Sequence, residues 1–241
     1  MKITFIIPTY NEVENLPRLL KALFFLPLAH LNVLIVDDNS PDGTGEVADA
    51  LTNEYPGRLS VLHRRGKLGL GSAYITAFHH LLKGDSEAIG QMDADFSHEP
   101  RKVIELVEAL RNCDIAIGSR YVPGGSVDKD WPFWRKRLSA FGNFYARSIL
   151  SLPIRDATGG FRLYRRDVLA AMPLERIQSN GYVFQVETAY VAHRLGFRFN
   201  EIPIYFAERR FGKSKMSFRI QVEAALRVWS LPYTYRDLRN R

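Results

Sequence analysis

Residues 87–98 read EAIGQMDADFSH, an apolar run that ends in two aspartates, Asp93 and Asp95. The run at 87–93 has the composition of a buried strand, and side chains two residues apart on a strand point the same way. Asp93 and Asp95 are therefore expected to point at one spot. Two carboxylates about 4 Å apart repel by about 4 kcal/mol at an effective dielectric of about 20, so either a proton or a cation is needed between them.

Other apolar segments of strand character alternate with segments of helical periodicity. Strands are predicted at 3–8, 32–38, 59–63, 87–93 and 114–119, and helices at about 14–25, 44–54, 70–83 and 100–111. This alternation predicts an α/β protein with a mostly parallel central sheet flanked by helices on both faces. Such sheets bind ligands at the carboxyl ends of their strands, where residues 8–12, 37–38 and 93–95 fall.

The pattern changes after residue 120. We predict a loop at 121–132, a helix at 133–151, a glycine turn with a short strand and a helix start in DATGGFRLYRRDVL (156–169), a helix at 184–195, a strand at 198–206, a basic loop at 207–217 and a last helix from about 216 to 230. Neither internal repeats nor a low-complexity linker is present. The second part of the chain is thus expected to complete the same unit.

Composition limits the class of protein. The chain has 241 residues, of which 46% are hydrophobic and 24% charged, as expected for one compact domain. A single cysteine, Cys113, excludes a disulfide framework and favours a reducing compartment. No zinc-ligand spacing, secretory leader or segment long enough to span a bilayer is visible in the sequence. We therefore expect a cytoplasmic protein, either soluble or peripheral on a membrane.

The net charge of +7 is concentrated near the C-terminus, because residues 207–241 hold nine Lys and Arg against three Asp and Glu. A basic segment is typical of proteins that bind nucleic acid or an anionic membrane. Since no nucleic-acid recognition motif accompanies the charge, we do not expect a nucleic-acid partner.

Two other glycine-containing segments are weak candidates for phosphate binding. GLGSAY at 69–74 lacks the third glycine of a dinucleotide fingerprint, and no Walker pattern is present, so we expect neither a nicotinamide cofactor nor a P-loop. SPDGTGE at 40–46 predicts a turn at Gly43 with Ser40 or Asp42 capping the next helix. Asp37 and Asp38 would then remain available to a ligand.

The Asp93-x-Asp95 pair has two interpretations. It could be part of a helix-capping cluster, with Ser97 capping a helix that starts near Pro100. It could instead bind Mg²⁺ or Mn²⁺ that bridges a nucleotide diphosphate, because these ions take carboxylate and phosphate oxygens. The position of the pair, at the ligand-binding edge of a central strand, favours the metal.

Seven stretches, in order along nearly the whole chain, carry a family resemblance: FIIPTYNEVENLPRLL, VLIVDDNSPDGTGEVAD, GLGSAY, QMDADFSHEP, IAIGSRYVPGG, NGYVFQVE and RRFGKSKMS. Together they resemble the polyprenyl-phosphate (dolichyl-phosphate) mannose synthases, family-2 glycosyltransferases with the Rossmann-like GT-A fold. The resemblance implies transfer of mannose from GDP-mannose to the phosphate of a membrane polyprenol, with inversion at the sugar carbon and assistance by Mg²⁺ or Mn²⁺.

The same resemblance implies roles for individual residues. The implied nucleotide-sugar site consists of Pro8, Tyr10, Glu12, Val36, Asp38, Asp93, Ala94, Asp95, Arg120, Arg209 and Lys215, and the implied acceptor site of Arg135 and Ser139. Asp93 and Asp95 would bind the metal, and catalytic roles fall to Asp95, Arg120 and Lys215. Some relatives have a glutamine as a further metal contact where this chain has Ser97, so either Ser97 or water would complete the metal site.

The resemblance also implies a division of the chain. Residues 1–206 would form the catalytic domain, with a nucleotide half at about 1–120 and an acceptor half at about 121–206. Residues 207–241 would form a mobile basic loop, which closes over the donor, and a membrane-proximal helix. One stripe of that helix, Phe218, Val222, Ala225 and Trp229, could lie in the membrane interface or pack on the catalytic core.

Several residues keep a plainer interpretation. Arg120 could form a surface ion pair, and Arg135 could lie on a solvated or lipid-facing surface. Residues 182–184 could belong to the core or to an acceptor groove, and Glu187 could contact either the sugar or a basic neighbour.

Other functions also remain open. One is a transferase that uses UDP-glucose or another UDP-sugar, although such relatives usually carry transmembrane helices. Another is a non-catalytic protein recruited to a membrane. A nucleotidyltransferase is disfavoured because PTYNE, rather than a glycine-rich basic signature, follows the first strand. A phosphate nucleophile is already anionic near neutral pH, so no strong general base is expected. Attachment to the membrane through a separate anchoring subunit also remains open.

Overall fold

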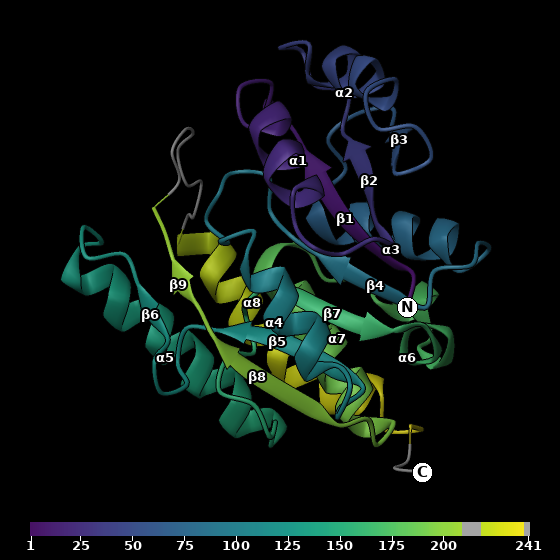
Figure 1. The fold of residues 1–241 in the computed structure, drawn as a ribbon. Coiled ribbons are helices and arrows are strands. Elements are labelled where there is room, and N and C mark those ends of the chain that lie inside the picture. The colour runs from purple at the N-terminus through teal and green to yellow at the C-terminus, as the bar shows by residue number, and fades with distance from the viewer. Residues whose placement is uncertain (209–217, 239–241) are drawn as a thin grey trace.

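In the computed structural model, a seven-stranded sheet has helices on both faces (Figure 1). The structure describes residues 1–208 and 218–238. Within the second range, it describes side chains only from residue 225 onward. The strands of the large sheet are β1 (Ile3–Thr9), β2 (Leu31–Asp37), β3 (Leu59–His63), β4 (Ala88–Gln91), β5 (Ile115–Ser119), β7 (Arg162–Arg165) and β8 (Phe199–Pro203). A second, two-stranded sheet consists of β6 (Ser126–Val127) and β9 (Tyr205–Phe206).

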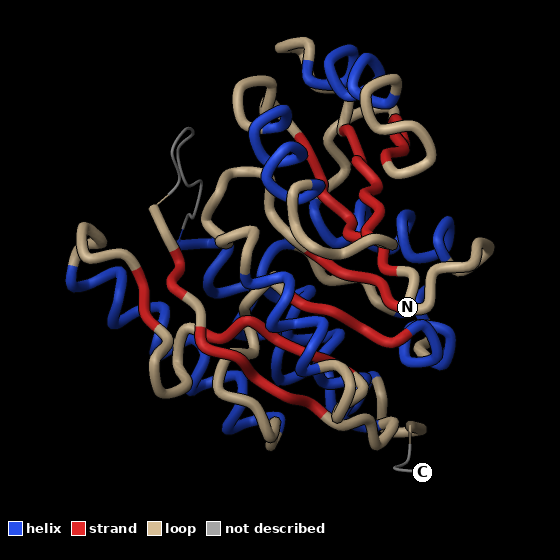
Figure 2. The backbone as a smooth tube through the Cα atoms, in the orientation of Figure 1, coloured by secondary structure: helices blue, strands red, loops and turns tan. Residues whose placement is uncertain are grey.

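Helices and loops connect the strands (Figure 2). The helices are α1 (Leu16–Phe24), α2 (Thr44–Thr52), α3 (Leu70–Leu81), α4 (Lys102–Ala109), α5 (Phe133–Leu150), α6 (Arg166–Ala171), α7 (Gly181–Arg194) and α8 (Phe218–Thr234), with a short 3₁₀ helix at Leu174–Arg176. None of the helices within the described ranges is long and apolar enough to cross a membrane.

The order of strands in the large sheet is β3-β2-β1-β4-β7-β5-β8. Strands β1, β2, β3 and β4 pair in parallel, as do β5 and β8, whereas β7 runs antiparallel between β4 and β5. The prediction of a mostly parallel sheet flanked by helices is therefore confirmed. The carboxyl ends of the parallel strands lie on one edge of the sheet, and this edge carries the candidate site.

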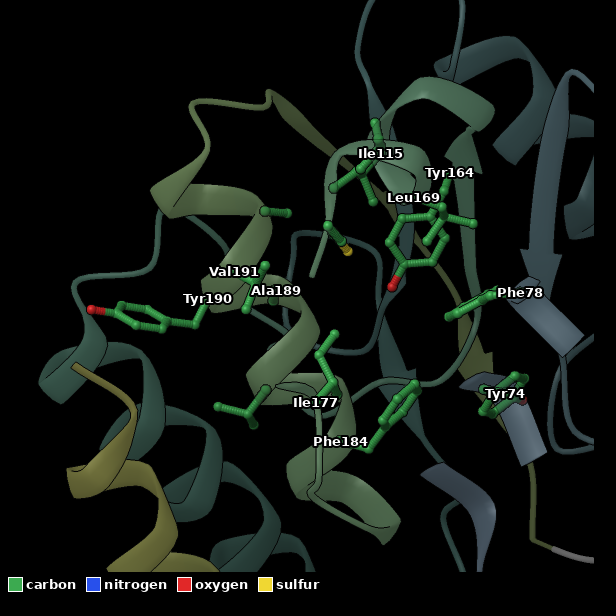
Figure 3. Close-up of a cluster of buried hydrophobic side chains, with 14 of the residues drawn as sticks. Tyr74, Phe78, Ile115, Tyr164, Leu169, Ile177, Phe184, Ala189, Tyr190 and Val191 are labelled. Carbon is green, nitrogen blue, oxygen red and sulfur yellow. The ribbon is translucent and has the colours of Figure 1, made fainter. Parts of the chain in front are cut away.

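Alternation along β1 divides the core between the two faces of the sheet. Ile3, Phe5 and Ile7 pack with residues of α1, α2 and α4, whereas Ile6 packs with residues of α3 and α5–α8. On the second face, Tyr74 of α3 stacks on Phe184 of α7 with ring centroids 5.7 Å apart (Figure 3). These aromatic contacts fix α3 and α7 beneath the strand ends.

Three predicted elements differ from the structure. The predicted strand 198–206 is wrong as a single element, because the chain changes partner at Ile204, whose N–H bonds to Ser119 while its carbonyl accepts from Ser126. The predicted loop at 121–132 accordingly contains β6. Helix α7 begins at Gly181, three residues before the prediction, since Val183 and Phe184 are already part of its buried face.

Helix α8 confirms the predicted C-terminal helix and packs against α5 and α7. Val228, Leu231 and Tyr235 on its inner face are buried in the core. In the predicted stripe, Trp229 is exposed, whereas Phe218 and Val222 lie outside the described side chains. Core packing and an exposed apolar face thus belong to different sides of the same helix.

Candidate functional site

The Asp-x-Asp segment lies in a loop that follows β4. The strand ends at Gln91, so the strand alternation invoked from the sequence does not orient Asp93 and Asp95. Local hydrogen bonds orient them instead. The Ser97 N–H donates to Asp95 Oδ1 over 3.0 Å, and the Asp93 N–H donates to His98 Nδ1 over 3.3 Å. Between them, Phe96 adopts φ +60°, a left-handed conformation that is rare for a bulky residue and typical of functional loops.

Both carboxylates nevertheless act on the same two buried groups, Tyr74 and His98. Burial raises the pKa of Tyr74, and the charges of Asp93 and Asp95 raise it further. Burial lowers the pKa of His98, against the opposing effect of the same two carboxylates. Since both aspartates act on the same phenol and the same imidazole, like charges are gathered at one place. His98 accepts from Asp93 and is therefore a neutral imidazole that holds the loop.

The loop after β4 does not cap a helix with Ser97, contrary to one interpretation of the sequence. Helix α4 begins at Lys102 and has no side-chain cap. The Ser97 hydroxyl is buried and makes no hydrogen bond within the described chain. A buried hydroxyl without a partner is costly, which points to a ligand that completes it.

The acidic pair after β2 is used differently from the sequence prediction. Asp37 accepts hydrogen bonds from Thr9 and from the backbone and hydroxyl of Ser40, and Asp38 pairs with the buried Arg64 over 2.6 Å. Burial raises the pKa of Asp38, although Arg64 opposes the shift. The prediction that both carboxylates stay available is wrong, because Asp37 binds Thr9 and Ser40 and Asp38 is paired with Arg64. The predicted turn at Gly43 is confirmed by its φ of +86°, but the predicted cap is wrong, because Gly43 itself is the N-cap of α2 and Asp42, one residue earlier, accepts from the Thr44 N–H.

The other predicted nucleotide residues lie at the same edge. Pro8 and Val36 are register partners near the ends of β1 and β2. Tyr10 follows β1, and the Lys67 Nζ lies 3.9 Å from the centroid of its ring. Glu12 accepts from the Asn15 side chain, and Ala94 is buried beside the aspartates. Asn11 and Asn39, which follow β1 and β2, also adopt positive φ, as Phe96 does after β4.

Arg120 follows β5 and forms a buried ion pair rather than a surface one. Its Nε and Nη2 donate to the two carboxylate oxygens of Asp156, each over 2.7 Å, and Nη2 also donates to the Thr158 hydroxyl. Burial by itself would raise the pKa of Asp156, but the Arg120 guanidinium holds it below its ordinary value. Burial opposes the charge on Arg120, yet Asp156 raises the pKa of Arg120 above its ordinary value. Within the described chain, the Nη1 atom of Arg120 donates to no group.

Arg120 and the aspartate loop are close together. Asp93 contributes to the raised pKa of Arg120, and Arg120 acts on the pKa of His98. Phe206 lies between them, with its ring 5.3 Å from the Arg120 guanidinium carbon and 5.4 Å from the His98 ring. The structure thus unites the acidic loop of β4 with a permanent cation from β5.

The predicted acceptor residues are on α5. Arg135 forms an ion pair with Glu208 over 2.9 Å and lies 3.8 Å from the centroid of the Trp131 ring. Ser139 shares a hydrogen bond of 2.7 Å with the Tyr121 hydroxyl. Arg135 is therefore engaged in the structure, in a partly exposed ion pair and a contact with an aromatic ring.

The segment that leads to the basic loop passes beside the aspartates. The Ala207 N–H donates to the Ser97 carbonyl over 3.2 Å, and Glu208 binds Arg135. Arg209 and Lys215, to which the resemblance gives donor-binding roles, lie outside the described residues.

Glu187 contacts a basic neighbour and not an open site. It is fully buried on α7 and accepts from Arg227, the Tyr235 hydroxyl and the Ser179 N–H. Phe184 is in the core, as one interpretation of residues 182–184 predicted.

Some participants were not predicted from the sequence. Asp156, Thr158 and Gly159 form the turn that holds Arg120, and a Cβ on Gly160 would lie 4.0 Å from Asp93 Oδ1 and 3.5 Å from the Gln185 amide nitrogen. The segment DATGG was interpreted only as a glycine turn. Its Asp-x-x-Gly pattern was the available signal, but its partner is 36 positions away in the sequence.

The residues present fit a hard divalent cation. The side chains of Asp93, Asp95 and Ser97 offer only oxygen atoms, and Ser97, whose hydroxyl has no partner in the described chain, bonds to the Asp95 carboxylate through its backbone N–H. No group of three or more His, Cys, Asp or Glu side chains among the described residues could hold a metal, so protein carboxylates alone do not complete a coordination shell. A substrate diphosphate and water would have to supply the rest.

The model of the family "Glycosyl transferase family 2" matches residues 4–172 of the chain. The chain belongs to glycosyltransferase family 2. This glycosyltransferase is 46% identical over 243 residues to the undecaprenyl-phosphate mannosyltransferase of Micrococcus luteus, covering 100% of this chain and 99% of the relative. It is 45% identical over 225 residues to the polyprenol monophosphomannose synthase of Mycolicibacterium smegmatis, covering 92% of this chain and 84% of the relative.

Solved structures of the glucosyl-3-phosphoglycerate synthase of Mycobacterium tuberculosis share the fold. The complex with Mn²⁺, UDP and phosphoglyceric acid has a TM-score of 0.67 at 15% identity, covering 97% of this chain and 78% of that one. The complex with Mg²⁺ and UDP has a TM-score of 0.65 at 16% identity, covering 97% and 79%. The predicted GT-A fold, the resemblance to the mannose synthases and the assignment as an enzyme are confirmed.

Proposed function

We propose that this glycosyltransferase moves mannose from GDP-mannose to the phosphate of a membrane polyprenol, with inversion at the sugar carbon. The names of two relatives at 46% and 45% identity support a mannosyl donor and a polyprenyl phosphate acceptor. The structural observation that carries the proposal is that the aspartate loop, through His98, and the buried cation Arg120 both contact the Phe206 ring at the carboxyl edge of the sheet. This arrangement suits two phosphate groups that must approach each other.

The donor would lie along the ends of β1, β2 and β4. Pro8, Tyr10 and Glu12 would line the nucleotide, Val36 and Asp38 would contact base and ribose, and Ala94 would lie beneath the diphosphate. The Asp38–Arg64 pair supports this placement, because it fixes the Asp38 carboxylate at the strand end.

Asp93 and Asp95, with the Ser97 hydroxyl, would hold Mg²⁺ or Mn²⁺ against the diphosphate. When bound, the ion supplies positive charge that stabilises the departing GDP. Arg209 and Lys215 would add positive charge there. The Ala207 bond to Ser97 supports their role, since it brings the preceding backbone to the aspartate loop.

The acceptor phosphate would approach from the side of β5 and α5. One of its oxygens attacks the sugar carbon while the bond from that carbon to the GDP oxygen breaks on the opposite face, which inverts the configuration. Arg120 offers Nη1 to hold the phosphate, and Arg135 and Ser139 would contact it from α5. The nucleophile is already anionic, so the reaction needs orientation and charge rather than a strong base.

This function implies a location. The polyprenyl chain lies in a bilayer while GDP-mannose is in the cytoplasm, so the enzyme would work at the cytoplasmic face of a membrane, on its own or with an anchoring subunit. The nucleotide half, residues 1–120, and the acceptor half, residues 121–206, would then form the catalytic domain, with residues 207–241 toward the membrane.

The test is the mass of the lipid product. Purified protein is incubated with Mg²⁺ or Mn²⁺, a polyprenyl phosphate and one of three donors: GDP-mannose, UDP-glucose or UDP-N-acetylglucosamine. A hexose added only from GDP-mannose is the expected result. Addition of a hexose from UDP-glucose alone would show that the donor is UDP-glucose and not GDP-mannose. The absence of a lipid product with every donor would overturn the proposed reaction and favour a non-catalytic role.

A further inference from the structure

Three buried polar side chains near the aspartate loop lack hydrogen-bond partners. Within the described chain, neither the oxygen nor the nitrogen of the Gln185 amide has a partner, and the same is true of the Tyr74 hydroxyl and the Gln91 amide nitrogen. All three side chains are at most 2% exposed. Because an unpaired polar group is costly to bury, these groups call for a ligand that supplies their partners.

Gln185 is the member of this group that faces the candidate site. A Cβ on Gly160 would lie 3.5 Å from the Gln185 amide nitrogen and 4.0 Å from Asp93 Oδ1, so these two atoms flank one point at which glycine has no side chain. We use the term Gly160 notch for this point. Gly160 has no positive φ, so its backbone does not require glycine, and the residue is partly exposed. What glycine contributes here is therefore the absence of a side chain.

A buried cation fixes the two sides of the Gly160 notch. Arg162 is fully buried, and it donates from Nε to the Gly159 carbonyl over 2.9 Å and from Nη1 to the Gln185 carbonyl over 2.8 Å. The residue before Gln185, Phe184, stacks on Tyr74 with the ring planes 7° apart (Figure 3). The glycine turn and the first turns of α7 are thereby held at a fixed spacing, as a preorganised binding site requires.

The groups around the Gly160 notch select the chemistry of its ligand. A side-chain amide is uncharged and both donates and accepts, whereas the Asp93 carboxylate accepts only. A hydroxyl can donate to one of these groups and accept from the other, and an amide can hold two neighbouring hydroxyls at once. A phosphate oxygen would be repelled by Asp93. The notch therefore suits a polyhydroxyl group, such as a hexose ring.

The Gly160 notch also lies between the two charged groups of the candidate site. Asp93 flanks it, while Gly159, the residue before Gly160, donates its N–H over 2.9 Å to Asp156, the partner of Arg120. In the proposed reaction, the sugar is transferred from the diphosphate at the aspartates to the phosphate at Arg120. The position of the notch therefore suits the sugar better than it suits the nucleotide or the polyprenyl phosphate.

We propose that Gln185 is a specificity-determining residue, whose amide binds hydroxyls of the donor sugar at the Gly160 notch. The assignment rests on the proposed function, since it names the group that would recognise the sugar at the proposed donor site. Gln185 neither makes nor breaks a bond in the reaction. Its contribution is to orient the sugar between the two phosphates.

Two variants alter the Gly160 notch in different ways. Gln185→Leu removes both hydrogen-bonding atoms of the amide at nearly the same size. Gly160→Ala places a methyl group in the notch, at ordinary van der Waals distances from its neighbours. The matched controls are Gln178→Leu, at an exposed position after the 3₁₀ helix, and Gly142→Ala on α5, where a Cβ would meet nothing within 4 Å. Each protein is compared with the wild type by thermal unfolding, by calorimetric titration with GDP and Mn²⁺, and by the kinetics of mannosyl transfer.

We expect both notch variants to be at least as stable as the wild type, because one loses an unpartnered buried amide and the other replaces a glycine at an unstrained position. Their affinity for GDP with Mn²⁺ should be unchanged, since GDP carries no mannose. The kcat/KM for GDP-mannose should fall about tenfold to a hundredfold. The two control variants should behave as the wild type in all three measurements.

Analogues of GDP-mannose, each lacking one hydroxyl of the sugar, identify the contact. The wild type should lose kcat/KM with an analogue whose missing hydroxyl binds Gln185. Gln185→Leu should lose nothing further with that analogue, because the substitution and the analogue remove the same hydrogen bond. If every analogue lowered kcat/KM by the same factor in the wild type and in Gln185→Leu, the sugar would not contact this residue, and the proposal would be overturned.

Two other outcomes would also overturn the proposal. One is wild-type turnover of GDP-mannose by Gln185→Leu and Gly160→Ala. The other is recovery of full turnover by Gln185→Leu when the Mn²⁺ concentration is raised, because the amide would then be a metal ligand.

The failure of the proposed function would be seen separately, as a wild type that transfers no mannose from GDP-mannose. Calorimetry with GDP-mannose, GDP, UDP-glucose and UDP then decides the role of Gln185. Both notch variants must bind the nucleotide sugar that the wild type prefers more weakly than the wild type does, while binding the corresponding nucleotide equally well. A wild type that binds no nucleotide sugar would overturn both proposals.

Discussion

Two charged clusters lie close together at the edge of the sheet, one after β4 and one after β5, and they are balanced in different ways. After β5, the carboxylate of Asp156 is buried and is neutralised by two hydrogen bonds from Arg120. After β4, Asp93 and Asp95 gather like charge around Tyr74 and His98. The first cluster is a buried ion pair, whereas the second gathers carboxylate and hydroxyl oxygens of the kind that a divalent cation binds.

The comparison separates positioning from ligand binding. The β5 cluster resembles a buried ion pair whose loss affects the fold, because each partner removed leaves an uncompensated charge. The β4 cluster resembles a binding site, in which the loss of one carboxylate affects activity more than the fold. The two clusters should therefore respond oppositely to the same kind of substitution, an aspartate changed to asparagine.

The largest effect is expected from Asp95→Asn. The change removes one of the two carboxylates proposed to hold the metal, so the rate of mannosyl transfer should fall by at least about a thousandfold. Stability should stay nearly equal, since the asparagine keeps an oxygen that accepts from the Ser97 N–H. The measurement pairs product formation with urea unfolding, with Asp49→Asn, an exposed aspartate on α2, as the control. Near-normal turnover would reject the metal site.

Asp156→Asn should have the opposite signature. It leaves the Arg120 guanidinium buried beside a neutral amide, and breaking a buried pair in this way costs about 3–5 kcal/mol of unfolding free energy. Urea unfolding measures the loss. Glu108→Gln, which removes an exposed ion pair with Arg111, is the matched control and should cost less than about 1 kcal/mol. Equal stability of the two variants would contradict the distinction between the clusters.

The sequence was sufficient for the β4 cluster but not for the β5 cluster. The Asp-x-Asp pair, its place after a buried strand and the alternation of strands and helices in the first half could all be predicted, because they depend on local pattern. The reason given for the convergence was nevertheless wrong: β4 ends at Gln91, and a loop with Phe96 at φ +60° orients the aspartates. A backbone conformation of this kind leaves no pattern in the sequence.

The ion pairs escaped prediction because they join distant segments. Arg120 pairs with Asp156 at a separation of 36 residues, and Arg64 pairs with Asp38 at a separation of 26. In the sequence, each of these charged residues is indistinguishable from one on the surface. Only the packed sheet shows that the charges are buried. The switch of strand partner at Ile204 is hidden for the same reason, since its new partner, Ser126, lies in a segment with the composition of a loop.

Acid should weaken the β5 cluster. Burial alone would raise the pKa of Asp156, but Arg120 holds it below its ordinary value, so the unfolded chain takes up this proton at a higher pH than the native state does. The stabilisation is therefore complete above the ordinary carboxyl pKa of about 3.9, and it is lost as the pH falls through the lower pKa of the native state. Urea midpoints of wild type and Asp156→Asn should draw together below about pH 4. If the difference between the two urea midpoints stayed constant down to the lowest pH measured, the Arg120–Asp156 pair would not be the cause of the loss of stability in acid.

The smallest effect is expected from Ser97→Ala. Whether this change raises or lowers stability tests directly whether the β4 cluster is a binding site. Without metal, the Ser97 hydroxyl is buried without a hydrogen-bond partner in the described chain, so its removal should leave stability unchanged or raise it by less than about 1 kcal/mol. With Mn²⁺ and GDP, the same change should reduce the thermal stabilisation, because a ligand oxygen beside Asp95 is lost and the metal binds a few-fold more weakly. Thermal unfolding of this variant without Mn²⁺ and GDP measures the change in intrinsic stability, and unfolding with both measures the change in stabilisation by the ligands. Unchanged stabilisation by the metal would mean that water, and not Ser97, completes the coordination, and the buried hydroxyl would then be only a defect of packing.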